Sequence, residues 1–353
     1  MRAKKWLSIT FSILISTYFI LYLFIYNIDP YGYFSKENKY IHNLTHVSNT
    51  IIVHNKLLVK DDIYLIGSSR QMRINPIEIE EYTKKSVQSL AQLASTLNAN
   101  IFLAKEVKKI NKNFLFSFDA FSLNSSRINL NLSINDRVKI YEKEFNDKRN
   151  IYLRLFDMNI LQASINNFIL KIKNKKLNFN ELKENKLNYE IDEKYIDNSF
   201  SRVNKMSEKE KNYVLLFKNY KLYNDNKIIS LAKIANKNDI FIIYPKHTSY
   251  YKAFHKYNNI EKQYFHAVKL LVQNTKAQVY SFYDINSGTK NSYNFDGNGW
   301  HFKPKVGSEL LKMIYTNKQN NNFNMYKLST ENIDAYLNNI STKVDKEINL
   351  NAI

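Results

Sequence analysis

The sequence predicts an α/β protein: a three-layer domain on a parallel sheet, with a largely helical insertion, preceded by one N-terminal transmembrane helix. Three observations lead to this prediction. The chain begins with a long apolar run, strand-like and helix-like segments then alternate over residues 61–127 and 236–318, and residues 134–235 carry charged stretches with helical spacing. With 353 residues, 44% of them hydrophobic, the chain can bury one sizeable core.

The N-terminal segment predicts a membrane anchor. MRAKK precedes 21 residues without a charge, Trp6 to Tyr26, which are enough to cross a bilayer as a helix. A cleavable signal peptide is the alternative, but its apolar region would be shorter and would end in small residues, whereas this one ends in LFIYNIDPYGYF. We therefore expect an uncleaved anchor over residues 1–26, single-pass in the inner (cytoplasmic) membrane. The basic residues before it predict that the C-terminal domain lies on the extracytoplasmic side.

Residues 27–60 are predicted to form a juxtamembrane connector, and the globular part follows it. DIYLIGSS predicts a buried strand with a sharp end, and NFLFSFDAFSLN, residues 113–124, predicts a second strand bounded by Asn and Ser. Residues 94–112 between them have helical spacing. Strand, helix and strand in this order form the unit of a parallel sheet.

The second half of the domain follows the insertion at about 134–235. DIFIIY and AQVYSFYDI predict two further strands, separated by the helical segment NIEKQYFHAVKLLVQNT. VGSELLKMIYTNK predicts the closing helix of a domain that spans residues 61–318. Residues 319–353 are predicted to form a polar tail with an amphipathic helix near NIDAYLNNI.

Composition narrows the classes of partner and cofactor. The net charge is +20, but the lysines alternate with Asn, Ile and Tyr in segments such as KNKKLNFNELKENKLN, without a basic stripe among stacking aromatics. We expect no nucleic-acid partner, whereas an anionic envelope polymer or lipid surface fits this charge. Zero cysteines exclude disulfides and a cysteine nucleophile, and the 7 histidines lack paired ligand spacing, so neither a metal nor a cofactor is expected.

Candidate catalytic residues follow the predicted strands, because ligands of parallel sheets bind at the carboxyl ends of the strands. A serine becomes a nucleophile when a histidine, oriented by a carboxylate, takes its proton. Ser69 follows the first strand, His301 lies in the loop NFDGNGWHFKP before the closing helix, and Asp296 precedes it as the orienting acid. Gly67 would permit a tight turn whose N–H groups stabilise an oxyanion. The alternative is an ordinary turn with helix-capping serines and a structural histidine.

Two arginines and a second histidine are candidate substrate-binding residues. Arg70 and Arg73 lie one helical turn apart, beside the candidate nucleophile, and guanidinium groups suit a carboxylate or phosphate on an envelope polymer. Equally compatible is a surface salt bridge with Glu78 or Glu80. His247, in YPKH, either lines the pocket or is a surface group at a strand end.

Four segments carry a family resemblance: NIDPYGYF, YLIGSSRQMRINP, FIIYPKHTSYY and NFDGNGWHFKPKVGSELLKMI. They resemble the SGNH (GDSL-like) hydrolase superfamily, in particular its membrane-anchored branch of alginate O-acetyltransferase and D-alanyl transfer accessory proteins. The resemblance spans about 27–127 and 236–315. It implies a flavodoxin-like fold, Ser69 as nucleophile and His301 as base.

The sequence departs from this family at four places. Ser68 stands where the hydrolases usually have Asp, Ala94 is the nearest counterpart of the oxyanion glycine, and SFDAFSLNSS replaces Gly-x-Asn-Asp. The family places its acid three residues before the histidine, where this chain has Asn298, whereas Asp296 lies five residues before it.

Two functions are compatible with these features. The first is an envelope-facing O-acyltransferase or esterase on a glycan or other polymer, with a membrane-bound acyl donor protein as partner. The second is a non-catalytic binding or assembly protein of the cell envelope that has kept the fold. A hydrogen bond between Ser69 and His301 would favour the enzyme.

Overall fold

A computed structural model of the chain describes residues 2–28, 60–92, 95–128, 158–172, 217–257, 259–296 and 299–350. These residues fall into two compact units. The larger unit is an α/β domain, and the smaller contains the helices α1 (Arg2–Ile28) and α7 (Met158–Ile172).

The α/β unit is built on a six-stranded sheet with the strand order β2-β1-β3-β4-β5-β6. Neighbouring strands are parallel from β2 to β5, and β6 is antiparallel to β5. The α/β prediction is confirmed, although the sheet is mixed rather than purely parallel. The strands are β1 (Ile63–Ile66), β2 (Val87–Ser89), β3 (Asn113–Ser117), β4 (Ile240–Ile243), β5 (Gln278–Ser281) and β6 (Tyr326–Leu328).

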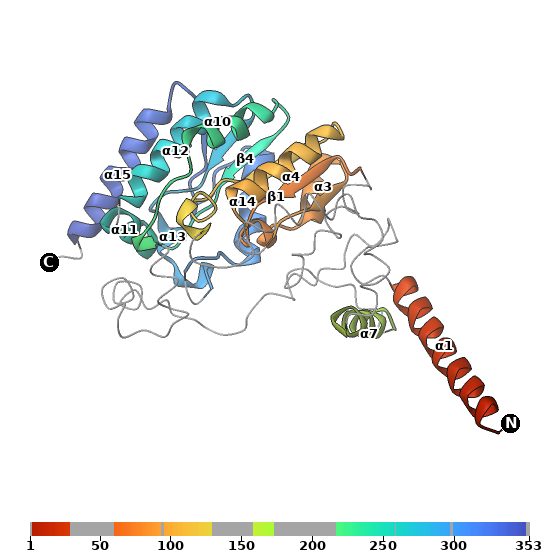
Figure 1. Cartoon of the computed structure of the whole chain (residues 1–353). Helices are drawn as coiled ribbons and strands as arrows, with labels where there is room; N and C mark the ends of the chain where they lie inside the picture. The colour runs from red at the N-terminus through yellow and green to blue at the C-terminus, as the bar shows by residue number, and fades with distance from the viewer. Residues whose placement is uncertain are drawn as a thin grey trace. The chain divides into compact units, whose positions relative to one another are not determined.

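Two groups of helices belong to this unit (Figure 1). In one group α10 contacts both α4 and α12, and α15 contacts α12 and α11; in the other, α3 contacts α14. The longer helices are α3 (Pro76–Thr83), α4 (Leu97–Lys109), α10 (Asp225–Ile234), α11 (Thr248–Lys256), α12 (Ile260–Asn274), α14 (Pro304–Thr316) and α15 (Ile333–Leu350). The short ones are η1 (Gln71–Arg73), η2 (Ser125–Ile128), α13 (Ser287–Lys290) and η4 (Ser292–Asn294).

The central strands are apolar along their length because helices cover a parallel sheet on both faces. Successive residues of β1, β3 and β4 are buried, so both faces of these strands are shielded from water. The rings of Phe114 and Phe116 lie 5.8 and 5.4 Å from the ring of Phe241 on the neighbouring strand. This aromatic layer fixes β3 against β4, and the carboxyl ends of both strands point toward the candidate site.

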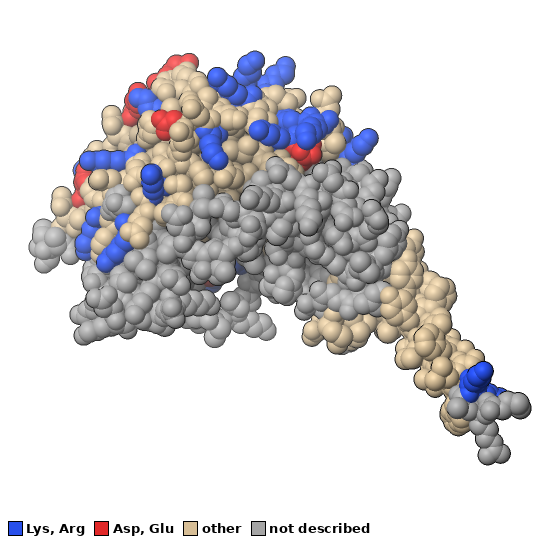
Figure 2. Space-filling model, viewed as in Figure 1, with Lys and Arg blue, Asp and Glu red and all other residues tan. Residues whose placement is uncertain are grey.

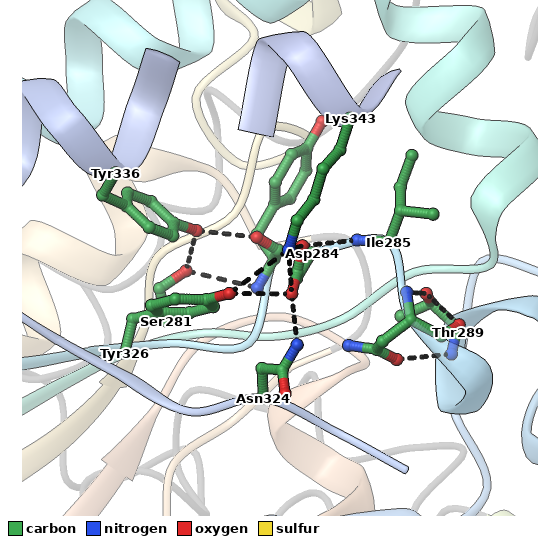
Figure 3. Close-up of polar contacts among 10 residues, drawn as sticks. Ser281, Asp284, Ile285, Thr289, Asn324, Tyr326, Tyr336 and Lys343 are labelled. Carbon is green, nitrogen blue, oxygen red and sulfur yellow. Dashed lines mark hydrogen bonds and ion pairs between the residues drawn. The ribbon is translucent and has the colours of Figure 1, made fainter. Parts of the chain in front are cut away.

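The predicted end of the domain at residue 318 is too early, because β6 extends the sheet and α15 packs on α11 and α12. The buried carboxylate of Asp284, just after β5, binds side chains from the segment after residue 318 (Figure 3). It accepts hydrogen bonds from Lys343 Nζ at 2.8 and 3.0 Å, from the Tyr326 hydroxyl at 2.9 Å and from Asn324 Nδ2 at 2.6 Å. The polar composition of the tail concealed its few buried apolar residues, among them Ile333, Ile340 and Val344.

The predicted insertion at 134–235 lies largely outside the described residues, as does most of the connector at 27–60. Two helices of the predicted insertion lie within the described residues. The helix α10 contacts α4 and α12 and therefore belongs to the α/β unit, whereas α7 belongs to the unit of α1.

Residues Lys4–Ile28 of α1 are long and apolar enough to cross a membrane. Figure 2 shows the shaft of this helix without charged side chains and with basic ones at its N-terminal end. On the α/β unit the same view shows basic and acidic side chains interspersed over the visible surface.

Candidate active site

The turn after β1 is shaped by a close approach that only glycine allows. A Cβ added at Gly67 would lie 2.6 Å from the Cβ of Ser117 on β3 and 2.9 Å from the Cβ of Gln71. These distances are far below ordinary van der Waals contact, so a side chain here would push the turn away from the sheet. The turn then closes with the amide of Gln71 donating to the carbonyl of Ser68 at 3.0 Å.

Ser69 is half-buried between two buried neighbours, Ser68 and Arg70. Its Oγ lies 2.7 Å from Nε2 of His301, which is 232 residues later in the sequence. The structure therefore brings together the two residues that the sequence analysis proposed as nucleophile and base.

The loop that carries His301 is tied to itself by backbone hydrogen bonds. Phe295 and Phe302 form an antiparallel bridge, and between them the amide of Asp296 donates to the carbonyl of His301 at 2.9 Å. The Gly299 amide donates to the Asp296 carbonyl at 2.7 Å, and Gly299 has a φ of 67°, which favours glycine. This closed loop directs the Asp296 carboxylate back toward the imidazole.

Asp296 binds the histidine twice. Its Oδ2 lies 3.1 Å from His301 Nδ1, and its Oδ1 accepts from the His301 amide at 3.1 Å. With Nδ1 donating to this carboxylate, Nε2 is left to accept the Ser69 hydroxyl proton. Asp296 thus occupies the acid position, whereas Asn298 lies outside the described residues.

Electrostatics favour the neutral imidazole. Burial lowers the pKa of His301 below its usual value, and the cationic Arg73 and Arg70 lower it further, against the opposing effect of Asp296. The His301 side chain still has 20% of its surface exposed, so solvent reaches it. A neutral, accessible imidazole can act as a general base near neutral pH.

Arg73 is bonded inside the site. Its NH2 lies 3.1 Å from Oδ2 of Asp296, so Arg73 pairs with the candidate acid instead of Glu78 or Glu80. Glu78 accepts from Ser308 Oγ, and Glu80 accepts from the amide of Val87. Burial lowers the pKa of Arg73 from its usual value, although Asp296 opposes this effect.

Arg70 lies beneath the turn and has no exposed surface. Its NH2 is 2.6 Å from Asp119 Oδ1, and its guanidinium carbon lies 4.3 Å from the ring centre of Trp300. It is therefore not available to a substrate in solvent. The same Asp119 accepts a hydrogen bond from Ser68 Oγ at 2.8 Å, so it joins Ser68 and Arg70, the two neighbours of Ser69. Through Arg70 this network also reaches Trp300, the residue before His301.

Asp119 is ionised in this environment. Burial alone would raise its pKa, but the positive charges of Arg70 and Lys246, together with hydrogen bonds from the Ser122 amide and the Ser68 hydroxyl, hold the pKa at about 2. Sequence inspection places Asp119 at the end of a strand but gives no indication of its partner, because Arg70 lies far away in the sequence and in a different turn.

Lys246 is the second buried cation-forming residue near Asp119. Its Nζ is fully buried and, within the described part of the chain, makes no hydrogen bond. Burial lowers its pKa well below the usual value, and Arg70 lowers it further, which outweighs the attraction of Asp119. Because arginine stays protonated, Arg70 carries the positive charge that pairs with Asp119, and burial disfavours a second positive charge on Lys246. Four aromatic rings surround Nζ at 5.1 to 5.6 Å, those of Phe254, Tyr264, Tyr283 and Trp300.

His247 is a buried residue, not the surface group that was the alternative in the sequence analysis. Its amide donates to the Gly299 carbonyl at 3.1 Å, and its ring lies edge-on to Phe295. Nδ1 lies 2.8 Å from Ser249 Oγ at the start of α11. His247 therefore connects the end of β4 to the loop of His301. Ala94, the nearest counterpart of the oxyanion glycine, lies outside the described residues.

Comparison with protein-family models gives no match, and comparison with curated protein sequences gives none either. Among the described residues, no group of three or more His, Asp and Glu side chains is arranged to hold a metal ion. The geometry of the site itself is that of a serine, a histidine and an aspartate in hydrogen-bonded series.

Proposed function

We propose that this chain is a membrane-anchored, envelope-facing acyl-ester enzyme, an O-acyltransferase or esterase acting on a glycan or other envelope polymer. The observation that carries the proposal is the hydrogen-bonded series of Ser69, His301 and Asp296, with distances of 2.7 and 3.1 Å. The same three roles in the same order define serine acyl transfer on unrelated folds.

The architecture supports an SGNH-like, flavodoxin-like domain. The order of the five parallel strands, β2-β1-β3-β4-β5, is the order of flavodoxin-like sheets. Helices in two separate groups fit a three-layer arrangement. In such sheets ligands bind where the strand order reverses, between β1 and β3, and the turn of Ser69 follows β1.

The reaction can be written with the groups present. Nε2 of His301 takes the Ser69 hydroxyl proton while Oγ bonds to the acyl carbonyl carbon of an ester. The tetrahedral intermediate then breaks its bond to the alcohol oxygen, which leaves with the proton from His301. A polymer hydroxyl or water attacks the acyl-enzyme, its proton passes to His301, and Ser69 regains a proton as the new ester or acid departs. Asp296 stabilises the imidazolium in both steps.

The anchor supports a location at the inner membrane. A single pass with Lys4 and Lys5 at the amino side would place the α/β unit outside the cytoplasm. Acyl donors made in the cytoplasm would then have to cross the bilayer, which explains why we expect a membrane-bound acyl donor protein as partner.

One observation favours a second candidate, a non-catalytic binding or assembly protein of the envelope. After β3, where SFDAFSLNSS replaces the Gly-x-Asn-Asp of the SGNH family, the buried Asp119 is an ionised carboxylate that only accepts hydrogen bonds. A catalytic site would then depend on backbone N–H groups of the Ser69 turn for oxyanion stabilisation.

Reaction of the full chain with a fluorophosphonate separates the two candidates, because this probe phosphonylates an activated serine. We expect labelling of the wild type, none of Ser69→Ala, and full labelling of Ser287→Ala, which removes an exposed serine remote in sequence. Equal labelling of the wild type and Ser69→Ala, or labelling of neither, would favour the binding protein.

A further inference from the structure

The helix α7 in the smaller unit presents an apolar stripe to solvent. Over residues 158–170 the sequence has no charged residue. At 100° per residue the exposed apolar side chains fall within an arc of about 100°. Exposed polar residues, Gln162 and Asn166, flank the stripe on one side. The stripe consists of Met158, Ile165, Phe168, Ile169 and Ile172, which are 41 to 73% exposed.

The helix α7 is joined to the end of the anchor. The ring of Phe168 packs edge-on against that of Phe24 with 5.6 Å between their centres. Ile25 on α1, and Ile160 and Ser164 on α7, are buried within this unit. On the helical wheel Ile160 and Ser164 lie beside the arc of the stripe, on the side away from Gln162. The exposed stripe is therefore continuous with the surface of α7 that packs within this unit.

The contact with α1 falls at the depth of a membrane surface. If Lys5 marks one face of the bilayer, Phe24 lies about 29 Å further along the helix at 1.5 Å per residue, close to the ~30 Å thickness of the hydrocarbon core. Tyr22 and Tyr26 stack on each other at the same level, with 6.1 Å between their rings, and tyrosine is enriched at this interface.

The length of α7 suits a position in the interface. Its 15 residues would extend about 22 Å, too short to span the hydrocarbon core. A helix with one apolar arc and one polar side lies in the interfacial plane. Five large exposed apolar side chains on a short helix are also unfavourable in water.

We propose that α7 lies along the membrane–water interface on the extracytoplasmic side of the membrane that α1 spans, with the stripe of Met158, Ile165, Phe168, Ile169 and Ile172 in contact with lipid. This inference rests on the proposed membrane-spanning role of α1. It gives the chain a second membrane contact, made by a segment far from the anchor in sequence.

The absence of cysteine allows a direct test with single-cysteine variants of the full chain. Ile165→Cys and Ile169→Cys report on the stripe, Asn166→Cys on the polar side of α7, and Ile15→Cys on the middle of α1. Each is labelled with an environment-sensitive nitrobenzoxadiazole dye and reconstituted in vesicles of phosphatidylcholine and phosphatidylglycerol. Quenching is measured with doxyl groups attached high on the lipid chains and with iodide in the buffer.

We expect doxyl lipid, but not iodide, to quench the dye at residues 165 and 169. At residue 166 we expect iodide to quench the dye. A dye at 165 and 169 that iodide quenches, or that is shielded from both quenchers by a second copy of the chain, would overturn the inference. The dye at residue 15 separates the two proposals: quenching by deep doxyl lipid there, without quenching on the stripe, would refute the role of α7 and leave the anchor in place.

Discussion

Replacing Lys246 with methionine is expected to stabilise the protein. The Nζ is fully buried and has no hydrogen-bond partner among the described residues, so the desolvation of the amine is not offset by a hydrogen bond. An unsatisfied buried polar group costs about 1–3 kcal/mol. Methionine fills a similar volume and suits an aromatic environment. Lys246→Met should therefore raise the free energy of unfolding by about 1–3 kcal/mol at neutral pH.

The sign of the pH dependence follows from the lowered pKa of Lys246. Because the unfolded lysine binds a proton that the folded one does not, the stability of the wild type rises with pH between the folded pKa and the usual value of 10.5. One proton gives a slope of about 1.4 kcal/mol per pH unit. The advantage of the methionine variant should therefore shrink as the pH rises through this window.

Urea unfolding of the full chain, followed by far-UV circular dichroism at several pH values, measures both effects. Lys343→Met is the matched control, because this lysine is ion-paired with the buried Asp284 (Figure 3). Its loss leaves a buried carboxylate without its cation and should destabilise the protein by about 1–3 kcal/mol. If Lys246→Met destabilised the chain as well, or if its effect did not depend on pH, the assignment of a lowered pKa and an unsatisfied amine to Lys246 would be refuted.

Two further substitutions and the pH dependence of labelling have expected outcomes. Gly67→Ala should destabilise the fold and abolish fluorophosphonate labelling, since its Cβ would lie 2.6 Å from that of Ser117; a variant with wild-type urea midpoint and labelling would contradict this. The labelling rate should fall on the acid side with a midpoint below pH 6.5, because the pKa of His301 is lowered and the protonated ring cannot accept the serine proton. Arg73→Met should move this midpoint to higher pH, since Arg73 favours the neutral ring; an unchanged midpoint would count against that coupling.

The sequence predicted the parts of the fold that local pattern encodes. The β1, β3, β4 and β5 strands are apolar runs that end in polar residues, and they are found where these runs occur. The edge strands β2 and β6 were not predicted, because V-Q-S and Y-K-L are too short to show a pattern and depend on pairing with β1 and β5. The helix α15 was only partly anticipated, since its few buried residues are spaced along a polar sequence.

In the candidate site, too, the sequence revealed what local pattern encodes and not what depends on tertiary contacts. Ser69, His301 and Asp296 could be proposed because each sits in a recognisable turn or loop that follows or precedes a regular element. The surroundings of Arg70 and Lys246 could not, because both side chains lie near Asp119, which follows β3, and near Trp300, and these residues approach only in the folded chain. Burial of a cation is a tertiary property that neither residue type nor spacing reveals.

The rate of fluorophosphonate reaction at Ser69, compared between the wild type and His301→Ala, most directly tests whether the imidazole activates the serine. General-base assistance contributes about 10²–10⁴-fold to such a step. We expect the variant to react at least about a hundredfold more slowly with an unchanged urea midpoint. Equal rates in two equally stable proteins would contradict the proposed chemistry.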